Sequence, residues 1–235
     1  MYNIATGASQ NHSKSLLQFI RSAYANIKDE FNLYVYDLGL SEDFLKLIRK
    51  FYPKAIIQTF DYSKYPEYYN INVNAGEYAW KSAIIKEVSD MTDGYLLWCD
   101  AGNMIQPIFN FKLLGELLDM YKVYSTTSSG NVRRWTHPKV LEKFGIEDNS
   151  PILNIQNKNG AIFAFNLKCK ESREFIDTFA NLSSKKEYIA PPGSDRSNHR
   201  QDQALFTILY YCFCQRYGIH YSDMYLGITI HNDCD

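Results

Sequence analysis

Short apolar runs and longer amphipathic stretches take turns along the first hundred residues. The apolar and aromatic runs predict four strands, at 3–6, 32–37, 55–60 and 95–99. Between them, apolar residues recur every three to four positions and predict three helices, at 13–25, from Ser41 to Pro53 and at 76–89. Ser41 has the side chain of an N-cap, and Pro53 ends its helix. This alternation predicts an α/β fold with a doubly wound, mainly parallel sheet.

The second half of the chain has a mixed pattern. It predicts helices at 111–121, 171–179 and 202–215, strands at 122–126 and 160–166, and a short strand near the end. Polar segments at 128–137 and 191–195 predict loops. Because the chain shows no internal repeat, low-complexity tract or linker, we expect one domain over residues 1–235. Its central sheet is expected to be mixed, mainly parallel and flanked by helices.

Charge and composition narrow the classes of partner. The 25 basic residues nearly balance the 26 acidic ones, so the chain lacks the basic surface typical of nucleic-acid binding. Aromatic residues make up 15% of the chain, including 19 tyrosines. Tyrosine combines a flat apolar ring with a hydroxyl group, which suits sugars and nucleobases, although most tyrosines serve packing.

The cysteines and the apolar runs predict the compartment. Five cysteines, scattered and odd in number, form neither a disulfide framework nor a zinc motif. The N-terminus lacks the pattern of a signal peptide, and the longest apolar run, 204–214, is too short to span a bilayer. We therefore expect a cytoplasmic protein without a transmembrane segment.

Several common α/β classes are disfavoured by missing motifs. No Gly-x-Gly-x-x-Gly follows the first strand, which disfavours a dinucleotide-binding fold. The chain also has no Walker loop and no Gly-x-Ser-x-Gly elbow, which argues against a P-loop NTPase and an α/β hydrolase.

Polar residues and glycines follow three of the predicted parallel strands. Thr6 and Gly7 end the first strand, Asp37 ends the second, and Asp100 and Gly102 follow the strand at 95–99. Because ligands of open α/β sheets lie outside the carboxyl ends of the strands, these residues predict a ligand site at one edge of the sheet. Asp100 stands where a metal or a phosphate-bearing ligand would lie, although an Asp that only starts a turn is the competing interpretation.

Five segments carry a resemblance to a known family. They lie, in this order, at 37–41 (Asp-Leu-Gly-Leu-Ser), 78–81 (Tyr-Ala-Trp-Lys), 98–103 (Trp-Cys-Asp-Ala-Gly-Asn), 159–166 and 199–203 (His-Arg-Gln-Asp-Gln). Together they resemble GT-A-type glycosyltransferases, the nucleotide-diphospho-sugar transferases, and in particular small viral and uncharacterised eukaryotic members. The resemblance covers nearly the whole chain and rests on the order of the segments. It implies a single GT-A (Rossmann-like) domain with a nucleotide-binding half, 1–103, and an acceptor-binding half, 104–235.

The resemblance also implies a divalent metal, commonly Mn²⁺ with Mg²⁺ as an alternative. In that family an Asp-x-Asp motif binds the metal that holds the donor's diphosphate. This chain departs from the motif, because Asp100-Ala101-Gly102 has no second acid. The predicted metal ligands are therefore Asp100, Asn103 and His231, with Asp233 as an alternative.

The predicted donor site combines strand ends with positive charge. The leaving nucleoside diphosphate needs a metal, Lys or Arg to stabilise its charge. Lys81 is one such candidate, although it would also suit an exposed helix face. Asp37 and Leu38 are expected to bracket the nucleobase, with a turn-capping Asp37 as the alternative. The residues predicted to bind the donor are Thr6, Gly7, Asp37, Leu38, Lys81, Trp98, Asp100, Ala101 and Arg133, with Arg134 beside the last.

The predicted catalytic residue is Asp202, although an acid at this position also suits a helix cap. By the resemblance it faces the sugar and the acceptor, either as the base of an inverting enzyme or as a stabiliser of the sugar in a retaining one. Asp195 is a weaker candidate. His199 and Arg200 are expected to shape the acceptor side.

These observations predict a glycosyltransferase of the hexosyltransferase type. It would move a sugar from a nucleoside-diphosphate donor to a hydroxyl of a glycan acceptor. The resemblance alone implies that the nucleotide is UDP. Retention is favoured over inversion because of the late His231. An aromatic loop supports a glycan acceptor; its tyrosines are Tyr62, Tyr65, Tyr68 and Tyr69. The alternatives are a degenerate, non-catalytic sugar-nucleotide-binding protein and a sugar nucleotidyltransferase, whose Gly-rich basic signature is missing after the first strand.

Overall fold

A six-stranded mixed sheet forms the centre of the molecule. The computed structural model describes residues 1–219 and 223–234. The strand order is β3 (Ile56–Thr59), β2 (Phe31–Asp37), β1 (Tyr2–Ala8), β4 (Tyr95–Cys99), β9 (Ile162–Asn166) and β6 (Val123–Tyr124). The first four strands in this order are parallel, whereas β9 runs antiparallel to both β4 and β6. The prediction of an α/β fold with a mixed, mainly parallel sheet is confirmed.

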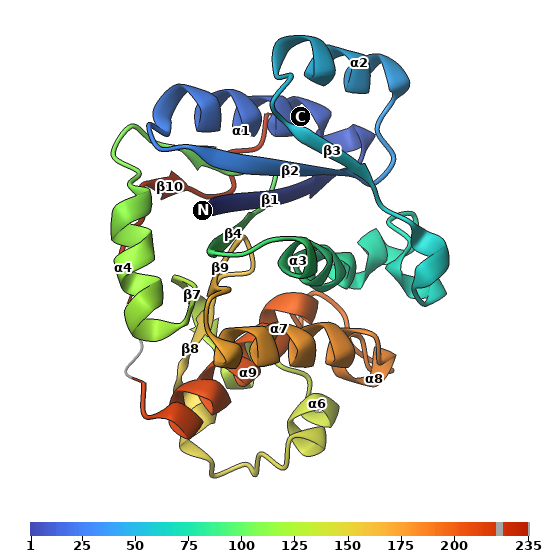
Figure 1. Cartoon of the computed structure of the whole chain (residues 1–235). Coiled ribbons are helices and arrows are strands. Elements are labelled where there is room, and N and C mark those ends of the chain that lie inside the picture. Colours follow the sequence, from blue (N-terminus) through green and yellow to red (C-terminus); the bar gives the residue numbers. More distant parts are fainter. Residues whose placement is uncertain (220–222, 235) are drawn as a thin grey trace.

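Helices cover both faces of this sheet (Figure 1). One face packs against α1 (Ser13–Asn26), α2 (Glu42–Phe51) and α4 (Phe111–Tyr121). The other face packs against α3 (Trp80–Met91), α7 (Lys170–Ser183) and α9 (Gln201–Tyr217). As predicted, α2 begins after Ser41, whose side chain accepts a hydrogen bond from the Phe44 amide.

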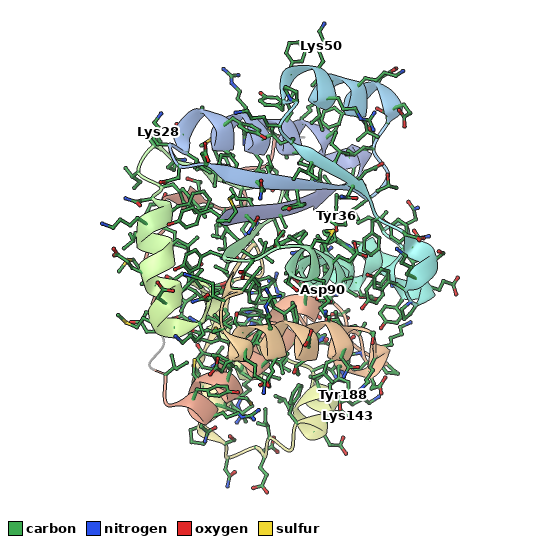
Figure 2. All side chains as sticks on the ribbon, viewed as in Figure 1. Lys28, Tyr36, Lys50, Asp90, Lys143 and Tyr188 are labelled. Carbon is green, nitrogen blue, oxygen red and sulfur yellow. The ribbon has the colours of Figure 1, made fainter. Side chains whose placement is uncertain are left out.

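Burial on both faces explains why β4 is apolar throughout. Leu96 and Trp98 pack into the layer with α3 and α7, while Leu97 and Cys99 pack into the layer with α1. A strand with two buried faces needs no polar alternation. Figure 2 shows the difference between buried and exposed side chains: Tyr36 points into the interior beside α3, whereas the labelled lysines at the rim of the molecule point outward.

The chain also forms short elements, most of which the sequence did not predict; the predicted short strand near the end is β10. Two small antiparallel pairs join β7 (Thr127–Asn131) to β8 (Gln156–Lys158) and β5 (Met104–Ile105) to β10 (Ile228–Thr229). The short helices are α5 (Val132–Trp135), α6 (Pro138–Lys143) and α8 (Lys186–Ile189), and the 3₁₀ turns are Gln10–His12, Tyr62–Lys64, Glu67–Tyr69, Asn74–Tyr78 and Pro151–Asn154. The predicted loop at 128–137 is therefore wrong, since it holds β7 and α5. Its polar sequence reflects a strand that is exposed and outside the central sheet.

The start of α3 also differs from the prediction. The helix begins at Trp80 rather than at residue 76. The preceding turn has positive φ angles at five successive residues, Asn74 to Tyr78, so its backbone is left-handed and cannot continue into a right-handed helix. Within the described part of the chain, no helix is both long and apolar enough to cross a bilayer.

Candidate functional site

A cavity of about 1250 Å³ opens at the carboxyl ends of β1, β2 and β4. Gly7, Leu38 and Asp100 line it from the strand ends, and α9 lines it from the second half of the chain through Asp202. The predicted edge of the sheet is thus the wall of a cavity. The predicted site residues that line it are Gly7, Leu38, Lys81, Asp100, Ala101, Arg200, Asp202, His231 and Asp233.

A lysine lies between two carboxylates in this cavity. The ammonium group of Lys81 is 2.9 Å from Oδ1 of Asp100 and 3.3 Å from Oδ2 of Asp202. It also donates to the carbonyl of Gly160 over 3.1 Å. The Lys81 and Asp202 side chains are each only 6% exposed, against 27% for Asp100. We call these three residues the Asp–Lys–Asp cluster.

The cluster is held from both halves of the chain. Asp100 follows β4 and accepts a hydrogen bond from Nε1 of Trp98 over 2.8 Å. Lys81 lies in the first turn of α3, and Asp202 lies in the first turn of α9. A Cβ at Gly160 would be 3.0 Å from the side chain of Gln203. The glycine before β9 therefore allows the start of α9 to approach closely.

Burial and charge tune the ionisation of the cluster. Burial raises the pKa of Asp202 to about 6, against the opposing effect of Lys81 and with a further increase from Asp100. Burial lowers the pKa of Lys81, but the two neighbouring carboxylates outweigh this effect and raise it overall. Lys81 therefore stays a cation, and Asp202 exchanges its proton near neutral pH.

The predicted metal ligands Asp100 and His231 line the cavity, whereas Asn103 does not. Asn103 is fully buried: its amide nitrogen donates to the carbonyl of Ala161, and its Oδ1 has no hydrogen-bond partner among the described residues. Both oxygens of Asp100 already accept hydrogen bonds, from Lys81 and from Trp98. Among residues 1–219 and 223–234, no three His, Cys, Asp or Glu side chains converge as metal ligands.

The tail near Gly102 brings a second acid to the turn after β4. The amide of Asn232 donates to the carbonyl of Gly102 over 2.7 Å. A Cβ built at Gly102 would overlap the carboxylate of Asp233. The space of a side chain at position 102 is thus filled by an acid from the other end of the chain.

Four residues predicted to bind the donor lie outside the cavity lining. Thr6 is buried within β1. Asp37 accepts hydrogen bonds from the amides of Gly39 and Leu40, so it caps a turn. Trp98 is buried and donates to Asp100, and Arg133 on α5 donates to the backbone carbonyl of Asp148, in the segment after α6.

The remaining candidates of the sequence also serve packing. His199 is buried: Nδ1 accepts from the amide of His137, and Nε2 contacts the carbonyl of Ile189 at 3.0 Å. Burial lowers the pKa of His199 to about 4, so the ring is neutral and anchors the loop before α9. Asp195 accepts hydrogen bonds within its own turn. The loop tyrosines pack within their own loop: the rings of Tyr65 and Tyr69 stack at 5.0 Å, and Tyr62 meets Phe60 edge-on.

The sequence missed an aromatic and cationic wall of the cavity. Tyr78 and Trp135 line it, and so does Arg196. Tyr78 lay within a segment that carried the family resemblance, but it received no role. Trp135 and Arg196 lie in polar segments whose positions relative to the sheet depend on long-range packing. The only available signal was the presence of Arg and Trp beside the predicted loops.

Solved structures with a similar fold are sugar transferases. The galactosyltransferase LgtC, in complex with donor and acceptor sugar analogues, matches 97% of this chain and 86% of its own, at a TM-score of 0.57 and 16% identity. An active-site mutant of LgtC matches at a TM-score of 0.56 and 14% identity, over 97% of this chain and 86% of its own. The apo bifunctional glycosyltransferase WbbM matches at 0.56 and 12% identity, over 95% of this chain and 38% of its own. The chain matches no protein-family model and no curated protein in sequence. The fold is therefore that of GT-A glycosyltransferases.

Proposed function

We propose that this protein transfers a sugar from a nucleoside-diphosphate donor, with UDP as the expected nucleotide, to a hydroxyl group of a glycan acceptor. The observation that carries the proposal is the Asp–Lys–Asp cluster, which lines a cavity of about 1250 Å³ at the carboxyl ends of the parallel strands. The glycosyltransferase fold supports it, because fold neighbours include a galactosyltransferase in complex with donor and acceptor sugar analogues.

The chemistry needs a cation and an acid in such an arrangement. The bond between the sugar's anomeric carbon and the phosphate oxygen breaks, and the nucleoside diphosphate leaves with the electron pair. Lys81 provides a fixed, poorly solvated positive charge beside this leaving group. The acceptor oxygen forms the new bond to the anomeric carbon and loses its proton.

Asp202 is the proposed catalytic residue. In its ionised form it removes the acceptor's proton if the enzyme inverts. If the enzyme retains configuration, it stabilises the cationic sugar, and the acceptor's proton passes to the phosphate oxygen of the leaving nucleoside diphosphate. The family resemblance favours retention of the sugar's anomeric configuration. Since the pKa of Asp202 is about 6, the carboxylate is available at neutral pH and still basic enough to take a proton.

Metal dependence stays a prediction. Asp100 and His231, two of the three predicted ligands, line the cavity, and we route no step through Mn²⁺ or Mg²⁺. Titration with and without Mn²⁺ is therefore part of the test.

The test is a calorimetric titration with UDP, with GDP as the control nucleotide. We expect UDP to bind more tightly than GDP and to bind more tightly with Mn²⁺, and we expect Asp100→Ala to weaken UDP binding at least about tenfold when Mn²⁺ is present. Asp202→Asn should keep UDP binding and lose turnover of UDP-sugars. Asp195→Asn, an exposed acid outside the cavity lining, is the matched control and should change neither. Absence of binding by both nucleotides, with and without Mn²⁺, would refute the donor site.

A non-catalytic sugar-nucleotide-binding protein is the second candidate. The observation that favours it is Gly102, which stands where the Asp-x-Asp motif has its second acid. It predicts UDP binding by the wild type without turnover of any UDP-sugar, with or without an acceptor. Turnover that is lost in Asp202→Asn would exclude it.

A further inference from the structure

Two arginines reach the cavity without an acidic partner. Arg196 and Arg200 both line it, and neither forms an ion pair with any Asp or Glu of the described residues. The acids of the cavity are engaged elsewhere: Asp100 and Asp202 pair with Lys81, and Asp233 lies beside Gly102, 3.9 Å from His12. On the α9 side of the cavity, neither guanidinium group is therefore paired with a carboxylate of residues 1–219 or 223–234.

Aromatic rings hold both guanidinium groups in place. The guanidinium carbon of Arg200 lies 4.0 Å from the ring centre of Trp135, and its backbone amide donates to the Trp135 carbonyl over 3.0 Å. The guanidinium carbon of Arg196 lies 5.1 Å from the ring centre of Tyr78, and the group also donates to the Tyr78 hydroxyl. Stacking of this kind fixes a planar guanidinium while its edge N–H donors stay available.

The two arginines also lie close to the reacting groups. Arg200 precedes Asp202 by two residues. The ring of Tyr78 lies 5.2 Å from the ammonium of Lys81, so the ring that carries Arg196 also borders the Asp–Lys–Asp cluster. The strand ends, where the donor's nucleotide is proposed to bind, form the other side of the same cavity.

We infer that the acceptor side of this cavity, formed by Arg196, Arg200, Tyr78 and Trp135, binds an anionic sugar residue that carries a carboxylate or a phosphate group. Guanidinium groups pair with both anions through two parallel hydrogen bonds. Aromatic rings beside them offer flat apolar contact for the face of a sugar ring. This inference rests on the proposed function and adds the class of acceptor.

Matched charged and neutral sugars test the inference. Binding of methyl glucuronide, glucose 6-phosphate and methyl glucoside is measured by saturation-transfer NMR, with and without saturating UDP. We expect at least one charged sugar to bind about tenfold more tightly than the neutral one at low salt. Which of the two charged sugars binds identifies the anion.

Variants of the arginines localise the effect. Arg196→Gln and Arg200→Gln should each reduce the preference for the charged sugar to about threefold or less, and leave UDP affinity unchanged. Arg21→Gln, at an exposed arginine on α1 outside the cavity lining, is the control and should change neither value. Circular dichroism of each variant checks that it is folded.

Two results would overturn the inference. One is equal binding of the charged and neutral sugars by the wild type. The other is loss of UDP affinity in the arginine variants with an unchanged preference among sugars, which would assign both arginines to the donor. Failure of the proposed function is distinguishable, because it appears as absence of UDP binding, whereas the sugar preference is also measured without UDP.

Discussion

The ammonium group of Lys81 lies between the carboxylates of Asp100 and Asp202, and all three side chains are mostly buried. Without its ammonium group, the carboxylates of Asp100 and Asp202 would face each other with no compensating charge. We expect Lys81→Met to lower the free energy of unfolding by about 3–5 kcal/mol at pH 7. The loss should be smaller at pH 5, because the pKa of Asp202 is raised to about 6 and its protonation removes the repulsion. Urea denaturation at the two pH values measures both quantities.

Lys86 on the same helix provides the matched control. Its ammonium pairs with Asp90 and Asp177, but its side chain is 34% exposed. Lys86→Met should therefore cost less than about 1 kcal/mol and show little dependence on pH. Similar losses in both variants would contradict the role assigned to Lys81.

The raised pKa of Asp202 predicts a pH dependence with a definite sign. Turnover requires the ionised carboxylate, so the rate should increase with pH and reach half its maximum near pH 6. Stability changes in the opposite direction. Because the folded protein binds this proton more tightly than the unfolded chain, the contribution of Asp202 to stability is full below about pH 4 and lost as the pH rises through about 6.

Asp202→Asn isolates this group in a stability measurement. Relative to the wild type, the variant should gain up to about 3 kcal/mol in free energy of unfolding between pH 4 and pH 7, since it has no proton to lose. Guanidinium denaturation across this range measures the difference. A constant difference between the two proteins would show that the pKa of Asp202 is not raised.

At the scale of elements, the sequence predicts the helices and strands that carry a clear local signal, such as an apolar run or an N-cap residue. The strand β4 is apolar because both of its faces are buried, and α2 carries its own N-cap at Ser41. The strand β7 was missed because it is short, polar and paired only with β8. The left-handed turn Asn74–Tyr78 was missed because its Ala, Glu and Tyr residues all favour a right-handed helix locally.

Gly76 makes that turn possible. Its φ of +64° suits glycine, and an added Cβ would overlap the carbonyl of Tyr69 and the ring of Trp80. Since Ala75 and Tyr78 of the same turn line the cavity, we expect Gly76→Ala to lower the melting temperature and to weaken binding of UDP or acceptor sugars. Differential scanning calorimetry and the titrations above measure these effects.

Gly145→Ala is a suitable control for the Gly76 variant. Its φ is also +64°, but no atom lies within 4 Å of an added Cβ. The control should show only the strain of the left-handed backbone, about 1 kcal/mol, and unchanged ligand binding. If the two variants were equally stable and bound ligands equally well, steric crowding at Gly76 would have no role.

At the scale of the molecule, the strand-end half of the site follows from the strand pattern. On the opposite half, Asp202 and Arg200 were predicted only through the family resemblance, and the aromatic rings beside them were not predicted. Parallel strands bring their carboxyl ends to one edge, so Gly7, Leu38 and Asp100 follow from the strand pattern alone. Trp135 and Arg200 come together only through packing between α5 and the loop before α9, which no local pattern encodes. The aromatic and cationic wall was accordingly visible only in the structure.

The C-terminal tail packs against both α1 and the turn after β4. The side chain of Gln18 on α1 donates to the carbonyl of Asn232, and the amide of Asn232 donates to the carbonyl of Gly102. The amide of Cys234 likewise donates to the side chain of Ser15 on α1. Because the carboxylate of Asp233 fills the space beside Gly102, this packing tolerates no side chain at position 102.

Gly102→Ala should therefore displace the tail while leaving the sheet intact. We expect the Asn232 amide to exchange its hydrogen at least about tenfold faster, which corresponds to a loss of about 1.4 kcal/mol in local stability. Hydrogen exchange followed by mass spectrometry measures this in the C-terminal peptide, with peptides from β4 as the internal control. The double variant Gly102→Ala/Asp233→Gly removes the overlapping carboxylate, so it should restore slow exchange. Equal exchange in the wild type and Gly102→Ala would mean that the tail does not pack against this turn in solution, and Asp233 would then have no place beside Asp100 in the cavity.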